Sequence, residues 1–200
     1  MAEVSMDLVK KLRDITGAGM MDCKKALYES DGDIERAVIL LRKKGAATAQ
    51  KRADKVASQG LVEAYIHPGN GLGVLIEINC ETDFVASTPD LKTFAKNLCM
   101  QIAALKPMCI TPEQLDPAYL QKEKEIMKDQ LAQSGKPANM LDKIIEGKLS
   151  KIYQDVCLIK QPYIKDDKHT VEDIINDLVA KLGEKIVIKR FARFQVGVND

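Results

Sequence analysis

The chain has 200 residues, 46% of them hydrophobic, and its 30 Lys and Arg residues nearly balance 29 Asp and Glu residues. This length allows one or two domains with a buried core, and a net charge of +1 provides no basic field for binding nucleic acid or an anionic membrane directly. No apolar run approaches the ~20 residues of a membrane helix, and residues 1–7 lack the basic and apolar regions of a signal peptide, so we predict a cytoplasmic protein.

The cysteines and histidines of the chain are few and poorly spaced for catalysis or metal binding. The five cysteines are widely spaced and form no Cys-x-x-Cys pair, which argues against a disulfide framework and a zinc site. His67 and His169 are the only histidines, so a catalytic triad or a histidine metal site has few candidate members. We therefore predict no cofactor and no bound metal.

Residues 1–45 are predicted to form a domain of three short amphipathic helices. Two apolar stripes have helical spacing: Leu8, Leu12 and Ile15, then Ile34, Ala37, Val38 and Leu41. Ser5 caps the first helix, and Thr16-Gly17-Ala18-Gly19 separates it from the second. Asp31-Gly32-Asp33 starts the third helix, and Gly45 is expected to end it. Three such helices share one small core.

Met20 and Met21 stand together at the start of the second predicted helix. Neighbouring side chains on a helix point about 100° apart, so both can hardly face the core of so small a bundle. One of them should be exposed, where a flexible and polarizable side chain suits docking against an irregular partner groove. The alternative is that both pack against the rest of the chain.

A second domain is predicted at residues 60–200, after a helix-prone connector at 46–59 that is rich in Ala, Lys and Arg. Strands at 61–66 and 73–78 flank Pro68-Gly69-Asn70-Gly71, which is a strong turn signal. The domain therefore opens with a β-hairpin.

The second strand runs into the segment Asn79-Cys-Glu-Thr-Asp-Phe-Val85, and Thr88-Pro89-Asp90 then starts a helix. Asp83 and Phe84 thus lie at a strand-to-helix corner, and such corners lie at the surface. Two interpretations stay open. Either Phe84 fills the local core while Asp83 caps the turn, or both side chains enter another molecule.

Three more helices are predicted in the second domain. A charged helix spans 116–131, and another follows Pro137 up to Tyr153, so we expect a helical hairpin that turns at 134–137. Residues 170–173 form a capping-box start for the last helix.

The last predicted strand, 185–196, alternates between apolar and polar residues. One face carries Ile186, Ile188, Ala192, Phe194 and Val196, and the other carries Lys185, Lys189, Arg193 and Gln195. We expect an antiparallel sheet with helices on one face, which is an α+β domain.

Three short motifs offer weaker chemical alternatives. Gly17-Ala18-Gly19 resembles part of a dinucleotide-binding loop, but a helix precedes it and the third glycine is missing. Glu81 and Asp83 would share one face of an extended segment, as an acid/base pair could, but no partner residue or glycine-rich pocket accompanies them. Asp166-Asp167-Lys168-His169 offers donor atoms to a cation, although Lys168 would repel it.

Longer motifs resemble bacterial elongation factor Ts. The longest are Thr16-Gly-Ala-Gly-Met-Met-Asp-Cys-Lys-Lys-Ala-Leu27 and Asn79-Cys-Glu-Thr-Asp-Phe-Val85, and shorter matches follow in family order at Ser134-Gly-Lys-Pro137, Glu146-Gly147, Gln161-Pro162 and Arg190-Phe-Ala-Arg-Phe194. The resemblance implies a three-helix domain of the ubiquitin-associated (UBA) type and a core domain that grips elongation factor Tu. Longer family members carry a second copy of the core subdomain, so the single copy here implies a homodimer.

The same resemblance implies a guanine nucleotide exchange factor in translation elongation, with no covalent chemistry. In the family, an aspartate and a phenylalanine at the positions of Asp83 and Phe84 intrude into the GTPase domain and disturb the elements that hold magnesium and the GDP phosphates. The implied contacts to elongation factor Tu are Thr82, Asp83 and Phe84 at the corner, Arg13, Met20 and Met21 in the first domain, and His67 at the hairpin turn.

Two other functions remain as alternatives. A general adaptor would use the three-helix domain to bind an unrelated helix and the core only for dimerisation. An enzyme would use Glu81 and Asp83 on a small substrate. Neither accounts for the paired methionines and for Asp83-Phe84 together, whereas an exchange factor needs both a binding surface and an intruding element.

Overall fold

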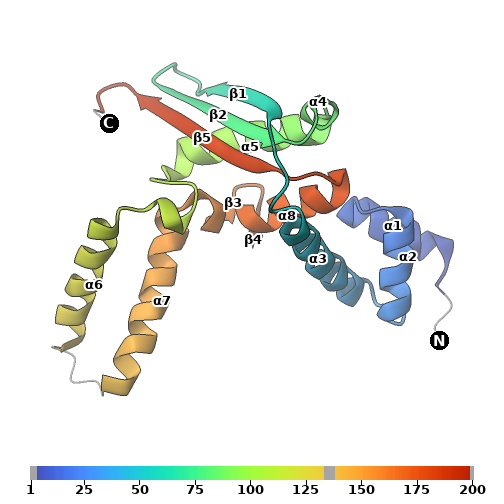
Figure 1. Ribbon diagram of the computed structural model, residues 1–200, viewed down its shortest axis with the longest axis horizontal. Helices are drawn as coiled ribbons and strands as arrows, with labels where there is room; N and C mark the ends of the chain where they lie inside the picture. Colours follow the sequence, from blue (N-terminus) through green and yellow to red (C-terminus); the bar gives the residue numbers. More distant parts are fainter. Residues whose placement is uncertain (1–3, 133–137, 199–200) are drawn as a thin grey trace. The chain divides into compact units, whose positions relative to one another are not determined.

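The computed structural model describes residues 4–132 and 138–198 and has an α+β architecture of helices and antiparallel sheet. The elements, drawn in Figure 1, are α1 (Met6–Thr16), α2 (Met20–Glu29), α3 (Ile34–Lys51), β1 (Gln59–Ile66), β2 (Leu72–Cys80), α4 (Asp83–Ala86), α5 (Pro89–Leu105), η1 (Pro112–Gln114), α6 (Pro117–Ala132), α7 (Ala138–Val156), η2 (Leu158–Lys160), β3 (Pro162–Tyr163), β4 (Asp166–Thr170), α8 (Val171–Leu182) and β5 (Val187–Gln195). Two compact units share them, one comprising Met1–Ala64, Leu75–Lys96 and Glu172–Phe191 and the other Tyr65–Val74, Asn97–Val171 and Ala192–Asp200.

The three helices predicted at the N-terminus form, and the first and third begin at the predicted caps. Ser5 caps α1 by accepting a hydrogen bond from the Leu8 amide (3.3 Å), and Asp33 caps α3. Gly17 ends α1 in the left-handed conformation (φ +66°), which a residue without Cβ adopts at little cost. The helices bury a shared apolar cluster made of Val9, Leu12, Cys23, Ala26, Leu27, Ala37 and Leu41.

Ile15 does not belong to the buried stripe of α1, which corrects the sequence prediction. Val9 and Leu12 are buried, whereas Ile15 is exposed. At 100° per residue, Ile15 lies about 120° around the helix from Val9, so it turns away from the face that Val9 and Leu12 define.

Gly45 does not end the third helix either, because α3 continues through it to Lys51. Gly45 is buried against α8: a Cβ at this position would lie 3.1 Å from the Asn176 carbonyl oxygen and 3.3 Å from the Ala180 Cβ. The glycine therefore permits close packing of two helices, and the helical part of the predicted connector prolongs α3 up to Lys51.

A three-stranded sheet has the strand order β1-β2-β5. The predicted turn joins β1 to β2 with positive φ at Gly69 (95°) and Asn70 (56°), and the His67 amide donates to the Leu72 carbonyl across it (2.8 Å). Val74, Ile76, Ile78 and Cys80 of β2 alternate on the buried face. Helix α5 begins after Thr88, whose hydroxyl accepts from the Leu91 amide (3.3 Å), as predicted.

Strand β5 does not keep one apolar face along its length, contrary to the predicted alternation. Ile188 is buried as expected, but Lys189 and Arg190 are both exposed, and this pair interrupts the period of two. Beyond it, the Arg193 guanidinium donates to the Ala103 carbonyl of α5 (3.3 Å), whereas Phe194 is exposed.

Helices α6 and α7 lie side by side, as the predicted helical hairpin requires (Figure 1). The predicted turn at 134–137 lies outside the described residues. A second sheet was not predicted: β3 and β4 pair antiparallel, with Tyr163 opposite Asp166. Buried Gln101 of α5 supports this sheet by donating to the Pro162 carbonyl (3.1 Å) and accepting from the Ile164 amide (3.1 Å).

All five cysteines are buried free thiols. Within residues 4–132 and 138–198, no helix is both long and apolar enough to cross a bilayer. The same residues hold no group of three or more His, Cys, Asp or Glu side chains arranged to bind a metal ion. In the segment 166–169, His169 Nδ1 contacts the carboxylate of Asp166, three residues earlier in β4.

Candidate functional site

The corner between β2 and α5 presents Phe84 to solvent. Strand β2 ends at Cys80, and the four residues of α4 carry Phe84 with 83% of its surface exposed, whereas Val85 and Ala86 beside it are buried. The alternative in which Phe84 fills the local core is therefore wrong. Its neighbours hold α4 against the fold, and the ring points away from it.

Thr82 caps α4, not Asp83. The Thr82 hydroxyl accepts from the Val85 amide (3.4 Å), and Asp83 is an exposed residue in the first turn. A carboxylate in this position also interacts favourably with the free amides at a helix N-terminus. Asp83 and Phe84 are thus adjacent exposed side chains, one charged and one aromatic.

Glu184 holds the corner from a distant part of the chain. Its carboxylate accepts three hydrogen bonds: from the Glu81 amide (3.1 Å), the Thr82 amide (3.0 Å) and the Thr82 hydroxyl (2.6 Å). Glu184 follows Gly183, which ends α8 with φ +75°. We call the contacts among Arg52, Glu81, Thr82, Glu184 and Lys185 the corner clamp.

Glu81 makes the reciprocal contacts of the corner clamp: Glu184 accepts from residues 81 and 82, and Glu81 accepts from the residue after Glu184. Its carboxylate accepts from the Lys185 amide (2.7 Å) and from the Arg52 guanidinium (2.8 and 3.1 Å). The hydrogen bond from Lys185 and the neighbouring Arg52 charge lower the pKa of the Glu81 carboxyl below its usual range. A lowered pKa moves Glu81 away from the range that suits a general base near neutral pH, so this geometry does not favour the enzyme alternative.

Sequence reasoning missed both Arg52 and Glu184. Glu184 follows a helix-ending glycine, a signal that marks the end of α8 and says nothing about residues 81 and 82. Arg52 stands at the C-cap of α3, within a connector that reads only as helix-prone. These contacts join segments separated by 29 to 104 positions, so no local pattern could have identified them.

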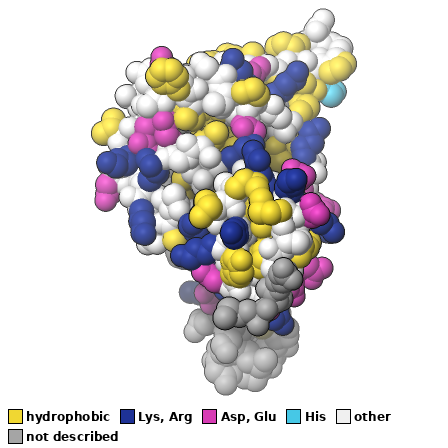
Figure 2. All heavy atoms as spheres, turned by 90° about the vertical axis from the view of Figure 1, so that its right-hand side faces the viewer, with side chains coloured by type: hydrophobic (Ala, Val, Ile, Leu, Met, Phe, Trp, Pro, Cys, Tyr) yellow, Lys and Arg dark blue, Asp and Glu magenta, His cyan; other side chains and the backbone are white. Residues whose placement is uncertain are grey.

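The paired methionines separate as the helical geometry predicts. Met20 packs against the apolar cluster of the three helices, whereas Met21 is 77% exposed at the start of α2. Arg13 is exposed in the last turn of α1. Figure 2 views the side on which Figure 1 draws these helices, and hydrophobic side chains reach its surface between mixed acidic and basic ones.

His67 lies at the hairpin turn, as predicted, and its ring is exposed. The Tyr65 hydroxyl lies 2.9 Å from His67 Nδ1, and the two rings meet edge to face. His67 belongs to the second unit, whereas the other six predicted site residues belong to the first. Each unit thus presents at least one of the predicted contacts.

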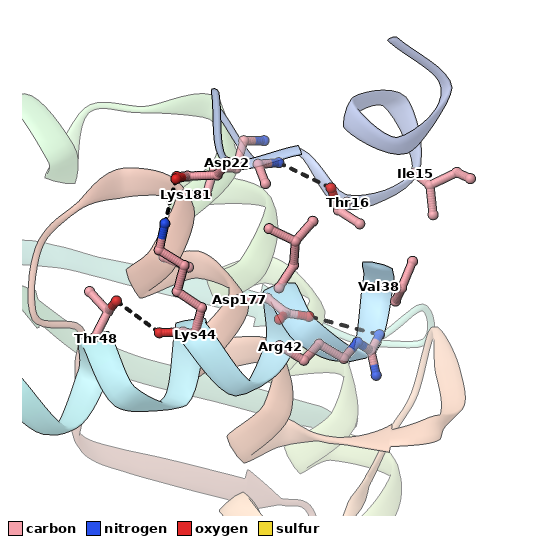
Figure 3. Close-up of a pocket in the computed structure, with 12 residues that line it drawn as sticks. Ile15, Thr16, Asp22, Val38, Arg42, Lys44, Thr48, Asp177 and Lys181 are labelled. Carbon is pink, nitrogen blue, oxygen red and sulfur yellow. Dashed lines mark hydrogen bonds and ion pairs between the residues drawn. The ribbon is translucent and has the colours of Figure 1, made fainter. Parts of the chain in front are cut away.

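A cavity of about 140 Å³ lies where the α1–α2 turn and α3 approach α8 (Figure 3). Its charged side chains are paired: Arg42 with Asp177 (3.9 Å), Lys44 with Asp22, and Lys181 with Asp90 (2.7 Å). Gly17 also lies here, and a Cβ on it would be 3.2 Å from the Lys181 side chain. The glycines at 17 and 19 thus lie in the turn between α1 and α2, as helix punctuation predicts, and Gly17 lies beside α8.

Comparison with known proteins identifies close relatives over nearly the whole chain. Residues 18–198 match the family model described as Elongation factor TS. Proteins named Elongation factor Ts are 55% identical in Caldanaerobacter subterraneus subsp. tengcongensis, over 97% of each chain, and 58% identical in Moorella thermoacetica, over 94% of this chain and 93% of the relative. The protein of that name from Thermotoga neapolitana is 53% identical over 98% of each chain.

Proposed function

The chain belongs to the elongation factor Ts family, and we propose that the corner at Asp83 and Phe84 is the element with which it promotes GDP release from elongation factor Tu. Elongation factor Ts is the nucleotide exchange factor for elongation factor Tu. The observation that carries the proposal is the 83% exposure of Phe84 beside the buried Val85 and Ala86. Leaving an aromatic ring in solvent forgoes its burial energy, which entry into a partner would recover.

The mechanism needs no covalent step. Asp83 and Phe84 enter the GTPase domain near the magnesium ion and the GDP phosphates, and they displace the protein groups that hold both. Magnesium bridges phosphate charge, so weakening its site speeds GDP release. By linkage, a factor that binds nucleotide-free partner better than GDP-bound partner lowers the affinity for GDP by the same ratio.

The three-helix domain at residues 1–45, which we propose to be UBA-like, binds a neighbouring surface of the same GTPase. The exposed Met21 and Arg13 supply its contacts, and the partly buried Met20 supports them from below. In the core domain at 60–200, Thr82 shapes the corner and His67 makes a further contact. The partner contacts are thus divided between a binding surface and an intruding element.

The deciding experiment is release of labelled GDP from elongation factor Tu, with and without this protein. The intact chain should accelerate release. Phe84→Ala should slow release clearly at unchanged protein stability, because the ring contributes to the complex and not to the fold. Met108→Ala is the matched control, since it also removes an exposed apolar side chain, which lies elsewhere. Equal release by Phe84→Ala and the intact chain would overturn the proposal.

The same assay distinguishes a general adaptor. An adaptor would bind its partner through Met21 and leave GDP release unchanged. In our proposal, Met21→Ala weakens the complex by about 1–3 kcal/mol, the range of an interface hot spot. Met20→Ala should act chiefly through stability, because Met20 packs on the apolar cluster. Binding measured by titration, together with thermal melts, separates the two effects.

We also propose that the chain forms a homodimer through its last strand. Strand β5 is an edge of the three-stranded sheet and exposes Phe194, while Val196 just beyond it is also exposed. An exposed apolar edge invites pairing with a second copy, and two-fold pairing is the commonest form. Light scattering at micromolar concentration should give the mass of a dimer, with or without reductant. A sharp monomer under those conditions would refute the idea.

A further inference from the structure

The corner clamp concentrates three hydrogen bonds on one carboxylate. Glu184 accepts from the amides of Glu81 and Thr82 and from the Thr82 hydroxyl, at 2.6 to 3.1 Å. Hydrogen bonds to an ionised acceptor are stronger than hydrogen bonds between neutral groups. The two amides belong to the residues directly before α4, so Glu184 acts on the point where the chain leaves β2 and turns into the short helix.

Helix α4 cannot hold its own position. It has four residues, and isolated helices shorter than about 12 residues are marginal because the first turn is costly to form. Two kinds of contact attach it to the rest of the fold. Val85 and Ala86 are buried, and Glu184 accepts a hydrogen bond from the Thr82 amide just before the helix. Packing of the Phe84 ring itself adds little support, since most of the residue is exposed.

We propose that Glu184 is a positioning residue for nucleotide exchange, which orients Phe84 in the free protein before the partner arrives. The inference rests on the proposed function of the corner. Without Glu184, Val85 and Ala86 still attach the helix, but the segment before it gains freedom and Phe84 samples several directions. Ordering the corner for the exchange step, after the three-helix domain has bound the partner, then costs free energy that the intact chain has already spent on folding.

The first test measures the corner in the free protein. The chain contains no tryptophan, so Phe84→Trp introduces a single indole at the site. In that background, Glu184→Ala should lower the indole's fluorescence anisotropy. Amide hydrogen exchange at residues 81 and 82 should become at least about 10-fold faster, the equivalent of losing one hydrogen bond to a charged group. Asp167→Ala, which removes an exposed carboxylate from β4, should change neither.

The second test separates positioning from simple stabilisation. With the native phenylalanine, Glu184→Ala should lower the maximal rate of GDP release at saturating factor about 10-fold or more, while the half-saturating concentration changes less than about 3-fold. All rates are expressed per folded molecule, with folded fractions taken from denaturation curves. Asp167→Ala should match the intact chain.

Conservative variants sharpen the second test. Glu184→Gln keeps the length and one acceptor oxygen, so it should recover most of the lost rate. Glu184→Asp keeps the charge but withdraws the carboxylate by one methylene, so it should recover little.

Several outcomes would overturn the inference. It is wrong if the amides at 81 and 82 exchange no faster in Glu184→Ala, or if that variant releases GDP as fast per folded molecule as the intact chain. If the intact chain itself fails to accelerate release, the proposed function fails. The amide-exchange result still decides separately whether Glu184 orders the corner.

Discussion

Met21 and Phe84 are both large apolar side chains exposed at the start of a helix, yet different forces hold them in place. Met21 stands on a ten-residue helix whose buried face belongs to an apolar cluster that includes the fully buried Leu12 and Leu27. Phe84 stands on a four-residue helix that is held partly by the carboxylates of Glu81 and Glu184.

This difference has a physical consequence. Apolar packing is non-directional and depends little on pH, so a surface built on it tolerates small shifts of the partner. Hydrogen bonds to carboxylates are directional and depend on ionisation, so they fix one orientation. A side chain that contacts a neighbouring surface needs only the first kind of support. One that must reach a particular site inside the partner benefits from the second.

The sharpest test of this comparison contrasts Leu12→Ala with Phe84→Ala. Leu12 is fully buried, so its truncation should cost about 2–5 kcal/mol of folding stability. Phe84 is mostly exposed, so its truncation should change stability by only about 0.5 kcal/mol. Urea denaturation curves measure both. A loss above about 3 kcal/mol for Phe84→Ala would mean that the ring supports the fold after all.

A second test concerns the packing of α3 on α8 and uses two helical glycines. A Cβ on Gly147 of α7 meets nothing within 4 Å, so Gly147→Ala should stabilise the protein by about 0.5–1 kcal/mol through helix propensity. At Gly45 the same methyl group would lie 3.1 Å from a backbone oxygen. The change in folding stability for Gly45→Ala should therefore be about 1–2 kcal/mol less favourable than that for Gly147→Ala in the same denaturation assay. Equal gains at both positions would show that the α3–α8 contact is loose.

The smallest effect is the pH dependence of the corner. The pKa of Glu81 is lowered in the folded protein, so its contribution to stability is complete above its unfolded pKa and is lost as pH falls toward the folded value. Stability should therefore decline on the acid side, and less steeply in Glu81→Gln. Denaturation curves from about pH 7 to pH 3 measure the slope, with Asp167→Asn as the control. Parallel slopes for Glu81→Gln and the intact chain would contradict this account.

Local features of the fold followed from the sequence because the residues that determine them are neighbours. Gly17 ends a helix because left-handed backbone suits glycine, and the turn at 68–71 forms because Gly69 and Asn70 tolerate positive φ. The exposure of one methionine at the start of α2 followed from the 100° between successive side chains. The motifs at 16–27 and 79–85 were long enough to indicate the family.

Only the tertiary structure decided the features that depend on residues far apart in the chain. A glycine at position 45 is typical of a helix end, but here it lies inside α3, where Asn176 and Ala180 of α8 leave no room for a side chain without a shift. From the local residues, Phe84 was compatible with a core position and with a surface position, and the burial of Val85 and Ala86 beside the exposed ring decided between them. Glu184 reaches Thr82 across 102 positions. Burial and hydrogen bonding of this kind depend on which segments the fold brings together, and a local pattern carries no information about that.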